Sequence, residues 1–274
     1  MRFDAVLAAL LAVPALAAPK GNFETRLRAR EAKQNLRAAG RLTHDAQEVT
    51  GPPNDRNIKY SSNWAGVARE QPPPDATYSA VSATFTVPEP TPTPGDDNFH
   101  GASAWVGIDG DTYKQTILQT GVDAVVNNGK KSYHPWYEWY PDYAHDFDMT
   151  VDANDTIVAR VHALSPSQGV AILENQCNGQ AATQTLNAPA PTATLAGQNV
   201  EWIIEDYEAA GSMVGLVDFG KVEFTGAEAK AGNSTYGMSD ARILEMLQDG
   251  KVLTDVSTEG DHTAVVEYIG GRKQ

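Results

Sequence analysis

The sequence of 274 residues contains a single cysteine, Cys177. A disulfide needs two cysteines, so an intrachain disulfide is excluded and the core has to be stable through its own packing, as it can be in a chain of this length. No motif pairs Cys177 with a histidine. We therefore expect a buried small side chain or a mildly exposed thiol rather than a nucleophile.

Motifs for metals and for serine hydrolases are also missing. The six histidines show no His-x-x-x-His spacing and no nearby acidic cluster, which argues against zinc. G-x-S-x-G is absent, as is the alternation of strands and helices that accompanies it. Asp109-Gly110-Asp111 begins like a calcium loop, but Tyr113 and Gln115 do not continue the ligand pattern. We expect a turn there, and neither a metal nor another cofactor.

Long apolar runs are confined to the N-terminus. Residues 1–17 contain Arg2, a short apolar core and the small-residue pattern Ala15-Leu16-Ala17, which together are typical of a secretory signal peptide. No later stretch approaches the ~20 apolar residues of a transmembrane helix. We therefore expect a secreted, extracellular protein with no membrane partner. Asn154 and Asn233 each begin an N-glycosylation sequon.

Basic residues are scarce, and many of them precede residue 60. Residues 18–59 contain nine basic and five acidic residues and end near a Gly51-Pro52-Pro53 hinge, which predicts a basic propeptide over 18–59. Residues 60–274 keep 11 of the 21 basic and 29 of the 35 acidic residues, a formal charge of −18. Such a domain repels phosphate-rich partners, so we expect no nucleic acid to bind.

Short runs of alternating apolar and polar residues follow one another over residues 60–274. Val81, Ala83, Phe85 and Val87 alternate with serine and threonine, and clusters of Gly, Pro, Asn and Asp separate such runs. This pattern predicts an all-β antiparallel sandwich in one domain. Residues 239–250 disagree locally, because they begin with an N-cap serine, continue with helix formers and end in glycine.

Two stretches carry candidate chemistry. In the first, Gln119 ends the second of two apolar runs; its amide supplies hydrogen bonds but no proton, so acid–base chemistry needs an acid from elsewhere. The second is the strand-like run of residues 200–207, in which a period of two puts Glu201 and Glu205 on one face and Asp206 on the other. A solvated sheet face would explain Glu201 and Asp206, so we expect those two to be exposed.

Five sequence blocks occur in an order that resembles the glutamic peptidases, or eqolisins. They are S-S-N-W-A-G at 61–66, A-W-V-G-I-D-G-D at 104–111, I-L-Q-T-G at 117–121, W-Y-E-W-Y-P at 136–141 and E-W-I-I-E-D at 201–206. The resemblance implies a sandwich of two antiparallel sheets of roughly seven strands each, with a strand rather than a helix near residues 239–250. Members of that family commonly carry several cysteines, and this chain departs from them.

The resemblance also implies a function and a site. It implies an endopeptidase that acts on proteins in acid. The leader and the domain carry opposite charges, so we expect the propeptide to inhibit the secreted enzyme. A Gln/Glu pair has no shared proton, so we expect insensitivity to inhibitors of aspartic dyads. Gln119 and Glu205 match the catalytic pair. The residues that match the lining or support of that site are Trp105, Asp123, Trp136 and Glu138. We expect a monomer.

Two other functions use the same residues. A β-sandwich glycoside hydrolase would need two carboxylates beside a sugar, for which Glu138 and Glu205 are available. A lectin-like module would bind sugars on the aromatic side chains of residues 136–140 without turnover. In each case the sandwich fold would be the same, so the fold alone does not choose among them.

Overall fold

The computed structural model describes residues 46–52, 58–91, 99–209 and 212–270, which all belong to one compact unit. The predicted signal peptide and most of the predicted propeptide lie outside the described residues. Every regular element in the described ranges is a β-strand, and none of them contains a helix that is long and apolar enough to span a membrane.

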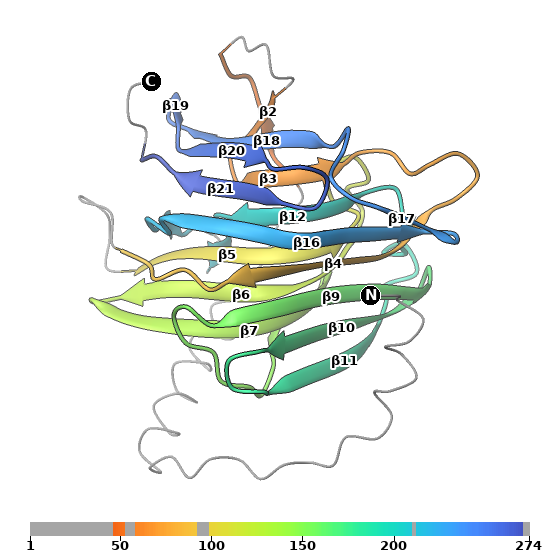
Figure 1. The fold of residues 1–274 in the computed structure, drawn as a ribbon, viewed down its shortest axis with the longest axis horizontal. Coiled ribbons are helices and arrows are strands. Elements are labelled where there is room, and N and C mark those ends of the chain that lie inside the picture. Colours follow the sequence, from red (N-terminus) through yellow and green to blue (C-terminus); the bar gives the residue numbers. More distant parts are fainter. Residues whose placement is uncertain (1–45, 53–57, 92–98, 210–211, 271–274) are drawn as a thin grey trace. The chain divides into compact units, whose positions relative to one another are not determined.

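The larger sheet has 11 strands and carries the sequence blocks described above (Figure 1). Its strands run in the order β1-β2-β18-β3-β12-β5-β6-β7-β8, with β15 beside β5 and β19 beside β18. The bounds are β1 (Glu48–Val49), β2 (Ile58–Ser61), β18 (Arg242–Gln248), β3 (Trp64–Arg69), β12 (Val200–Glu205), β5 (Phe99–Ile108), β6 (Ile117–Asn127), β7 (Lys130–Tyr140), β8 (His145–Asp146), β15 (Gly215–Leu216) and β19 (Lys251–Val252).

The second sheet has eight strands in the order β11-β10-β9-β4-β16-β21-β20, with β17 beside β16. Its bounds are β11 (Ala181–Asn187), β10 (Gln168–Asn175), β9 (Thr156–Ser165), β4 (Tyr78–Thr86), β16 (Lys221–Ala231), β21 (Ala264–Tyr268), β20 (Thr254–Thr258) and β17 (Ser234–Tyr236). A separate hairpin joins β13 (Glu208–Ala209) and β14 (Ser212–Met213). The predicted antiparallel sandwich is confirmed, and two-residue strands at edges explain why the larger sheet exceeds seven strands.

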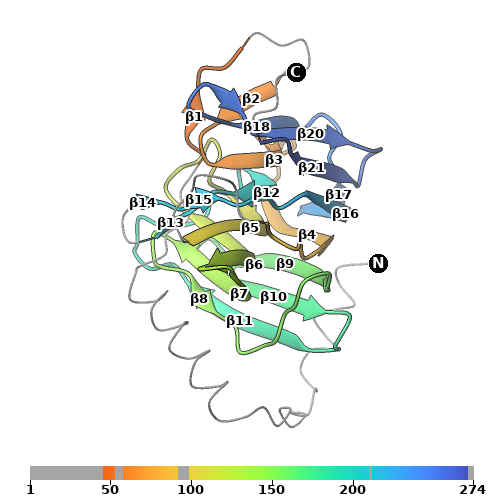
Figure 2. The ribbon, with the colours of Figure 1, turned by 90° about the vertical axis from the view of Figure 1, so that its left-hand side faces the viewer.

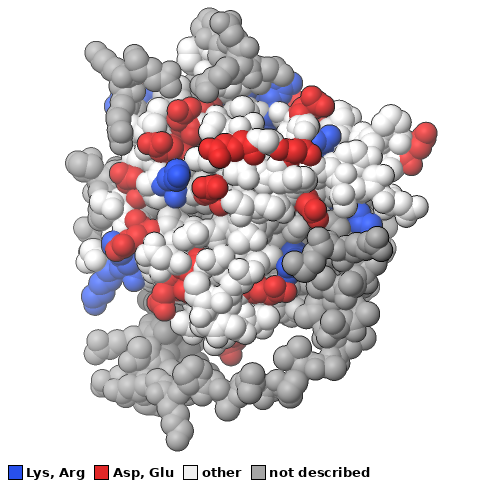
Figure 3. Space-filling model, viewed as in Figure 1, with Lys and Arg blue, Asp and Glu red and all other residues white. Residues whose placement is uncertain are grey.

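The main core lies between the two sheets (Figure 2). Trp202 of β12 is fully buried there, and its indole Nε1 donates a hydrogen bond of 3.0 Å to the carbonyl oxygen of Ser82 on β4. The rings of Phe85 and Phe224 pack with centroids 5.6 Å apart. Each large apolar side chain buried in this way contributes ~1.5–3 kcal/mol. On the face shown in Figure 3, most of the exposed charged side chains are Asp and Glu.

The helix signature over residues 239–250 was wrong, and the strand that the resemblance implies is confirmed. β18 lies between β2 and β3, so both of its backbone edges find partners. Its Leu244 and Met246 are fully buried, and the buried carboxylate of Glu245 accepts hydrogen bonds from Thr254 Oγ1 at 2.6 Å and Val256 N at 2.8 Å. Tertiary pairing and burial therefore override the local helix propensity.

The N-terminal edge of the larger sheet crosses the predicted propeptide boundary. β1 pairs with β2, and the backbone N–H of Ala46 donates to the Gly110 carbonyl at 3.3 Å. Residues 48–49 and 58–59 are thus part of the sheet in the full-length chain. A boundary at residue 59 remains a prediction.

The surface motifs noted in the sequence lie in exposed positions. Cys177 is exposed, and its Sγ accepts a hydrogen bond of 3.3 Å from the Thr156 backbone N–H. Asn154 and Asn233 are both exposed. None of these residues contributes to the core.

Candidate active site

Strand register brings all six predicted site residues to one face of the larger sheet. Directly opposed residues of antiparallel strands point to the same side, as do residues two positions apart. Across β3, β12, β5, β6 and β7 the register gives three successive rows on that face. The rows are Trp64–Glu205–Ser103–Asp123–His134, then Gly66–Ile203–Trp105–Gly121–Trp136, then Ala68–Glu201–Gly107–Gln119–Glu138.

Trp105 of β5 lies in the row between those of the two predicted catalytic residues. Its indole Nε1 donates a hydrogen bond of 2.9 Å to Oε2 of Glu205. A Cβ atom placed on Gly107 would lie 2.8 Å from Cζ3 of the same indole and 3.3 Å from Cβ of Gln119. The indole therefore extends from the Glu205 carboxylate to Gly107, which is directly opposite Gln119.

A second glycine allows β5 and β6 to approach closely at Trp105. On Gly121 of β6, a Cβ atom would lie 2.5 Å from Cβ of Trp105 and 2.2 Å from the Ala104 carbonyl oxygen, closer than real contacts allow. The glycine in the L-Q-T-G block is thus required by the close approach of the β5 backbone.

A cluster of buried apolar residues that includes three tryptophans lies on this face. Trp64 and Trp105 pack edge to face with centroids 4.9 Å apart, and Trp136 Nε1 donates to Ser103 Oγ at 3.2 Å. We call this set the aromatic cluster; its buried members are Ala46, Trp64, Ala68, Trp105, Ile117, Trp136, Ile203 and Leu244. It gives the site an apolar floor.

The other predicted residues lie beside this floor, and the register adds three that sequence reasoning missed. Asp123 of β6 is directly opposite His134 of β7, whose Nε2 lies 2.9 Å from Ser132 Oγ. Glu138 is directly opposite Gln119. Trp64, Ser103 and His134 were missed, although continuing the alternation of residues 136, 138 and 140 backwards would have reached His134.

Every predicted site residue is buried in the full-length chain: Gln119, Glu205, Glu138, Trp105 and Trp136 are 0% exposed and Asp123 is 3% exposed. Ala46, which precedes β1, is part of the aromatic cluster and is 1% exposed. Ala46 thus helps to cover this face. Within the described ranges, no group of three or more His, Cys, Asp or Glu residues is arranged to hold a metal ion.

Comparison with known proteins agrees with this arrangement. The model of the peptidase A4 family matches residues 62–268. The chain belongs to the peptidase A4 family of glutamic peptidases. The prediction drawn from the five blocks is therefore confirmed, and this membership favours a peptidase over the glycoside hydrolase and the lectin-like module.

Two relatives of this A4 peptidase match along nearly the whole chain. Aspergillopepsin-2 of Aspergillus niger is 40% identical, over 98% of this chain and 100% of that protein. Scytalidopepsin B of Scytalidium lignicola is 35% identical, over 97% of this chain and 98% of that protein.

Solved structures agree in fold. Scytalido-glutamic peptidase with a peptide-based transition state analog is 32% identical, with a TM-score of 0.67 over 76% of this chain and 98% of that one. Aspergilloglutamic peptidase from Aspergillus niger is 50% identical, with a TM-score of 0.59 over 62% of this chain and 99% of that one.

The expectation that Glu201 and Asp206 are exposed was wrong. Glu201 is 0% and Asp206 is 2% exposed, because both faces of β12 are covered. Burial raises the pKa of Glu201 well above its ordinary value, and the nearby charges of Asp111 and Asp109 raise it further. This A4 peptidase therefore holds a carboxyl that favours its protonated form on the same face as Gln119 and Glu205.

Asp109 and Asp111 are fully buried in the turn that follows β5. The Asp109 carboxylate accepts four backbone N–H bonds of 2.7–3.2 Å from residues 196–199, the segment that leads into β12. Burial raises the pKa of both aspartates, although these N–H donors act against the rise at Asp109 and Lys59 acts against it at Asp111. The predicted turn is confirmed, and it also anchors the strand that carries Glu205.

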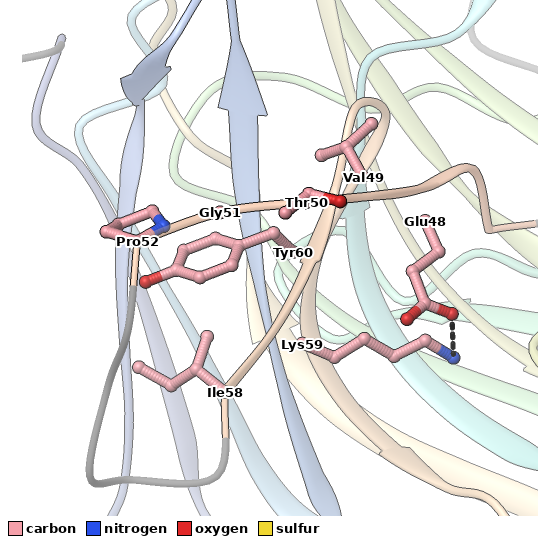
Figure 4. Close-up of a pocket in the computed structure, with 8 residues that line it drawn as sticks. All are labelled: Glu48, Val49, Thr50, Gly51, Pro52, Ile58, Lys59 and Tyr60. Carbon is pink, nitrogen blue, oxygen red and sulfur yellow. Dashed lines mark ion pairs between the residues drawn. The ribbon is translucent and has the colours of Figure 1, made fainter.

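Lys59 lies among three carboxylates at the N-terminal edge. Its Nζ is 2.7 Å from Asp111, 3.5 Å from Glu70 and 3.7 Å from Glu48; Figure 4 shows the last of these pairs. Burial alone would lower the pKa of Lys59, but these carboxylates raise it above its ordinary value. A cavity of about 530 Å³ lies beside this lysine, between residues 48–52 and 58–60, and none of the predicted site residues lines it.

Proposed function

We propose that this A4 peptidase is a secreted endopeptidase that hydrolyses peptide bonds of proteins in acid through Gln119 and Glu205. The observation that carries the proposal is the indole of Trp105, which donates to the Glu205 carboxylate at 2.9 Å and reaches the backbone beside Gln119. The solved relative with a peptide-based transition state analog supports a peptide substrate. The signal peptide pattern of residues 1–17 supports secretion, and we propose a monomer.

The proposed mechanism needs one proton carrier and one hydrogen-bond donor. Glu205 takes a proton from a water molecule, the resulting hydroxide attacks the peptide carbonyl carbon, and the carbonyl oxygen becomes negative. Glu205 then gives the same proton to the leaving nitrogen as the C–N bond breaks. Gln119 donates its amide N–H to the negative oxygen, and this donor is present at every pH.

Trp105 and the aromatic cluster have supporting roles in this scheme. The indole N–H fixes one oxygen of Glu205, so the other oxygen is oriented for the water. The apolar floor removes bulk water around the reacting atoms, which strengthens the hydrogen bond from Gln119 to the developing charge.

Digestion of an unfolded protein tests the proposal. The domain without its leader is incubated with the substrate at pH ~3–4, where carboxylates are near their ordinary pKa values, with and without an inhibitor of aspartic peptidases. We expect soluble peptides in both samples, because a Gln/Glu pair lacks the shared proton of an aspartic dyad. Release of peptides only without inhibitor would contradict the Gln/Glu assignment.

Gln119→Ala should lower kcat by about 10² to 10³, the usual loss when one oxyanion donor is removed. The measurement is kcat on a chromogenic peptide in acid, with thermal unfolding as a check of the fold. Gln184→Ala is the matched control, because Gln184 is exposed on the edge strand β11 of the other sheet. A near-normal rate for Gln119→Ala would show that the amide is not the donor.

We further propose that residues 18–59 inhibit the peptidase domain until acid releases them. Ala46 is part of the aromatic cluster, and Lys59 is held by Asp111, Glu70 and Glu48. Lys59 acts against the rise that burial causes in the pKa of Asp111. Protonation of Asp111 therefore weakens its contact with Lys59. By linkage the attachment is strongest while Asp111 is ionised and weakens as pH falls.

A synthetic peptide of residues 18–59 should bind the domain of residues 60–274 more tightly at pH ~6 than at pH ~3.5, because the carboxylates are ionised at the higher pH. Binding should also weaken in salt, since pairs near the surface are screened. Titration calorimetry at both pH values, in low and high salt, measures the difference. Equal affinity in all four conditions would rule out electrostatic release.

A further inference from the structure

Asp206, the residue after Glu205, is hydrogen-bonded to the chain just before β3, the neighbour of β12 on the side away from β5. Asp206 is 2% exposed, and its backbone N–H donates a hydrogen bond of 2.8 Å to the carbonyl oxygen of Asn63. Asn63 directly precedes β3, and Trp64 at the start of β3 is opposite Glu205. The end of β12 and the start of β3 are therefore fixed to each other at the level of the proposed catalytic base.

A single amide on a third strand completes this attachment. Gln248, the last residue of β18, donates from Nε2 to Asp206 Oδ2 at 2.7 Å and to the Ser62 carbonyl oxygen at 2.8 Å. An amide NH₂ group has two hydrogens, so both bonds can form at once. Gln248 thus joins the ends of β18, β3 and β12, which are neighbours in the sheet in that order.

This amide acts on Glu205 through the backbone. Trp105 holds the Glu205 carboxylate from the β5 side, while Gln248 holds the next residue from the β18 side. Because residues 205 and 206 share a peptide plane, the direction of the Glu205 side chain depends on where Asp206 is held. Catalytic groups need to be held within about 0.5 Å of their productive positions.

We propose that Gln248 is a positioning residue for the general base Glu205, acting through its hydrogen bonds to Asp206 and Ser62. The inference rests on the proposed function of Glu205. Gln248 itself does not touch the reacting atoms. A charge-neutral donor suits the position, because an amide N–H can donate to Asp206 at every pH without adding a charge.

Removal of the amide should affect turnover rather than substrate binding. We expect Gln248→Ala to lower kcat about tenfold with KM changed less than twofold, because small misplacements of a catalytic group cost rate. Both constants are measured on one peptide substrate in acid, and thermal unfolding reports how much enzyme is folded. Gln184→Ala, which removes an exposed amide from β11, should leave both constants unchanged.

Gln248→Glu separates positioning from packing, because the introduced carboxyl can donate only while it is protonated. While it is protonated it can replace the hydrogen bond to Asp206, and once it is ionised it repels the Asp206 carboxylate. The rate of this variant relative to wild type should therefore be highest in acid and should fall as pH rises. A role in packing alone would give a ratio that does not change with pH.

Three results would overturn the inference: wild-type kcat for Gln248→Ala, a lower melting temperature with unchanged kcat per folded enzyme, or a pH-independent ratio for Gln248→Glu. Each of these results can be distinguished from a failure of the proposed function by the activity of Glu205→Gln. If Glu205→Gln keeps its activity, Glu205 is not the base and the proposed function fails. If Glu205→Gln is inactive while Gln248→Ala is normal, only the role of Gln248 is wrong.

Discussion

Glu205→Gln should abolish peptide hydrolysis, with a loss of about 10⁴ in kcat or more, the upper end for a proton carrier. The substitution removes the only proposed proton carrier but keeps the side-chain volume, and the amide oxygen can still accept the hydrogen bond that Trp105 donates to the carboxylate. The fold should therefore survive. The measurement is kcat on a chromogenic peptide in acid, combined with thermal unfolding of the same sample.

Glu201→Gln is the control for this substitution. Glu201 lies on the same strand and the same face, four residues earlier, and is equally buried. Its removal should leave kcat in acid nearly unchanged, because burial favours its protonated form there. Retained activity in Glu205→Gln, or a comparable loss in Glu201→Gln, would mean that the base is assigned to the wrong residue.

The second large effect concerns stability, which should be highest in acid and fall towards neutral pH. Asp109, Asp111 and Glu201 are fully buried, and each has a pKa above its ordinary value because of burial. Between the ordinary and the raised pKa the folded state binds more protons than the unfolded state, so unfolding becomes easier as pH rises. The stabilisation is complete below pH ~4 and is lost as pH rises through the raised values.

The three buried groups act on stability in the same direction. For a domain of this size, each kcal/mol lost from the free energy of unfolding lowers the melting temperature by about 2–4 °C. Lys59 acts against the rise in the pKa of Asp111, whereas the charge of Glu70 adds to that rise. We therefore expect a lower melting temperature at pH ~7 than at pH ~4, as measured by thermal unfolding at both pH values.

Glu201→Gln should remove much of that fall, because an amide stays neutral in a buried position where a carboxylate is unfavourable. Relative to wild type, its melting temperature should be unchanged at pH ~3 and raised at pH ~7. Glu267→Gln is the matched control, since Glu267 is exposed on β21. Parallel curves for wild type and Glu201→Gln would show that Glu201 does not cause the pH dependence.

The fold and the shared face of the candidate site could be predicted from the sequence because they depend on local pattern and on short blocks. A period of two assigns Glu201 and Glu205 to one face, and the blocks nominate Gln119 and Glu205 as the proposed pair. The same period does not say what covers a face, so the exposure of Glu201 and Asp206 was predicted wrongly. The helix signature over residues 239–250 was wrong for a related reason. Helix propensity is a local property and does not include pairing with β2 and β3, the two strands that flank β18.

Gln248 could not be predicted in this way. Its contacts with Asp206 and Ser62 join residues 42 and 186 positions apart. They exist because β18 is inserted between β2 and β3, which brings its last residue to the end of β12. No spacing within β18 indicates that arrangement.

The insertion of β18 also determines when the protein can become a peptidase. β2 and β3 are among the first strands of the described chain, yet each pairs with β18, a strand near its C-terminal end. During synthesis the two early strands lack this shared neighbour until residue 248 has left the ribosome, and such distant pairing makes folding slow. The sheet that holds Gln119 and Glu205 is thus incomplete until β18 has been made, and a growing chain lacks the finished sheet on which the proposed catalytic pair lies.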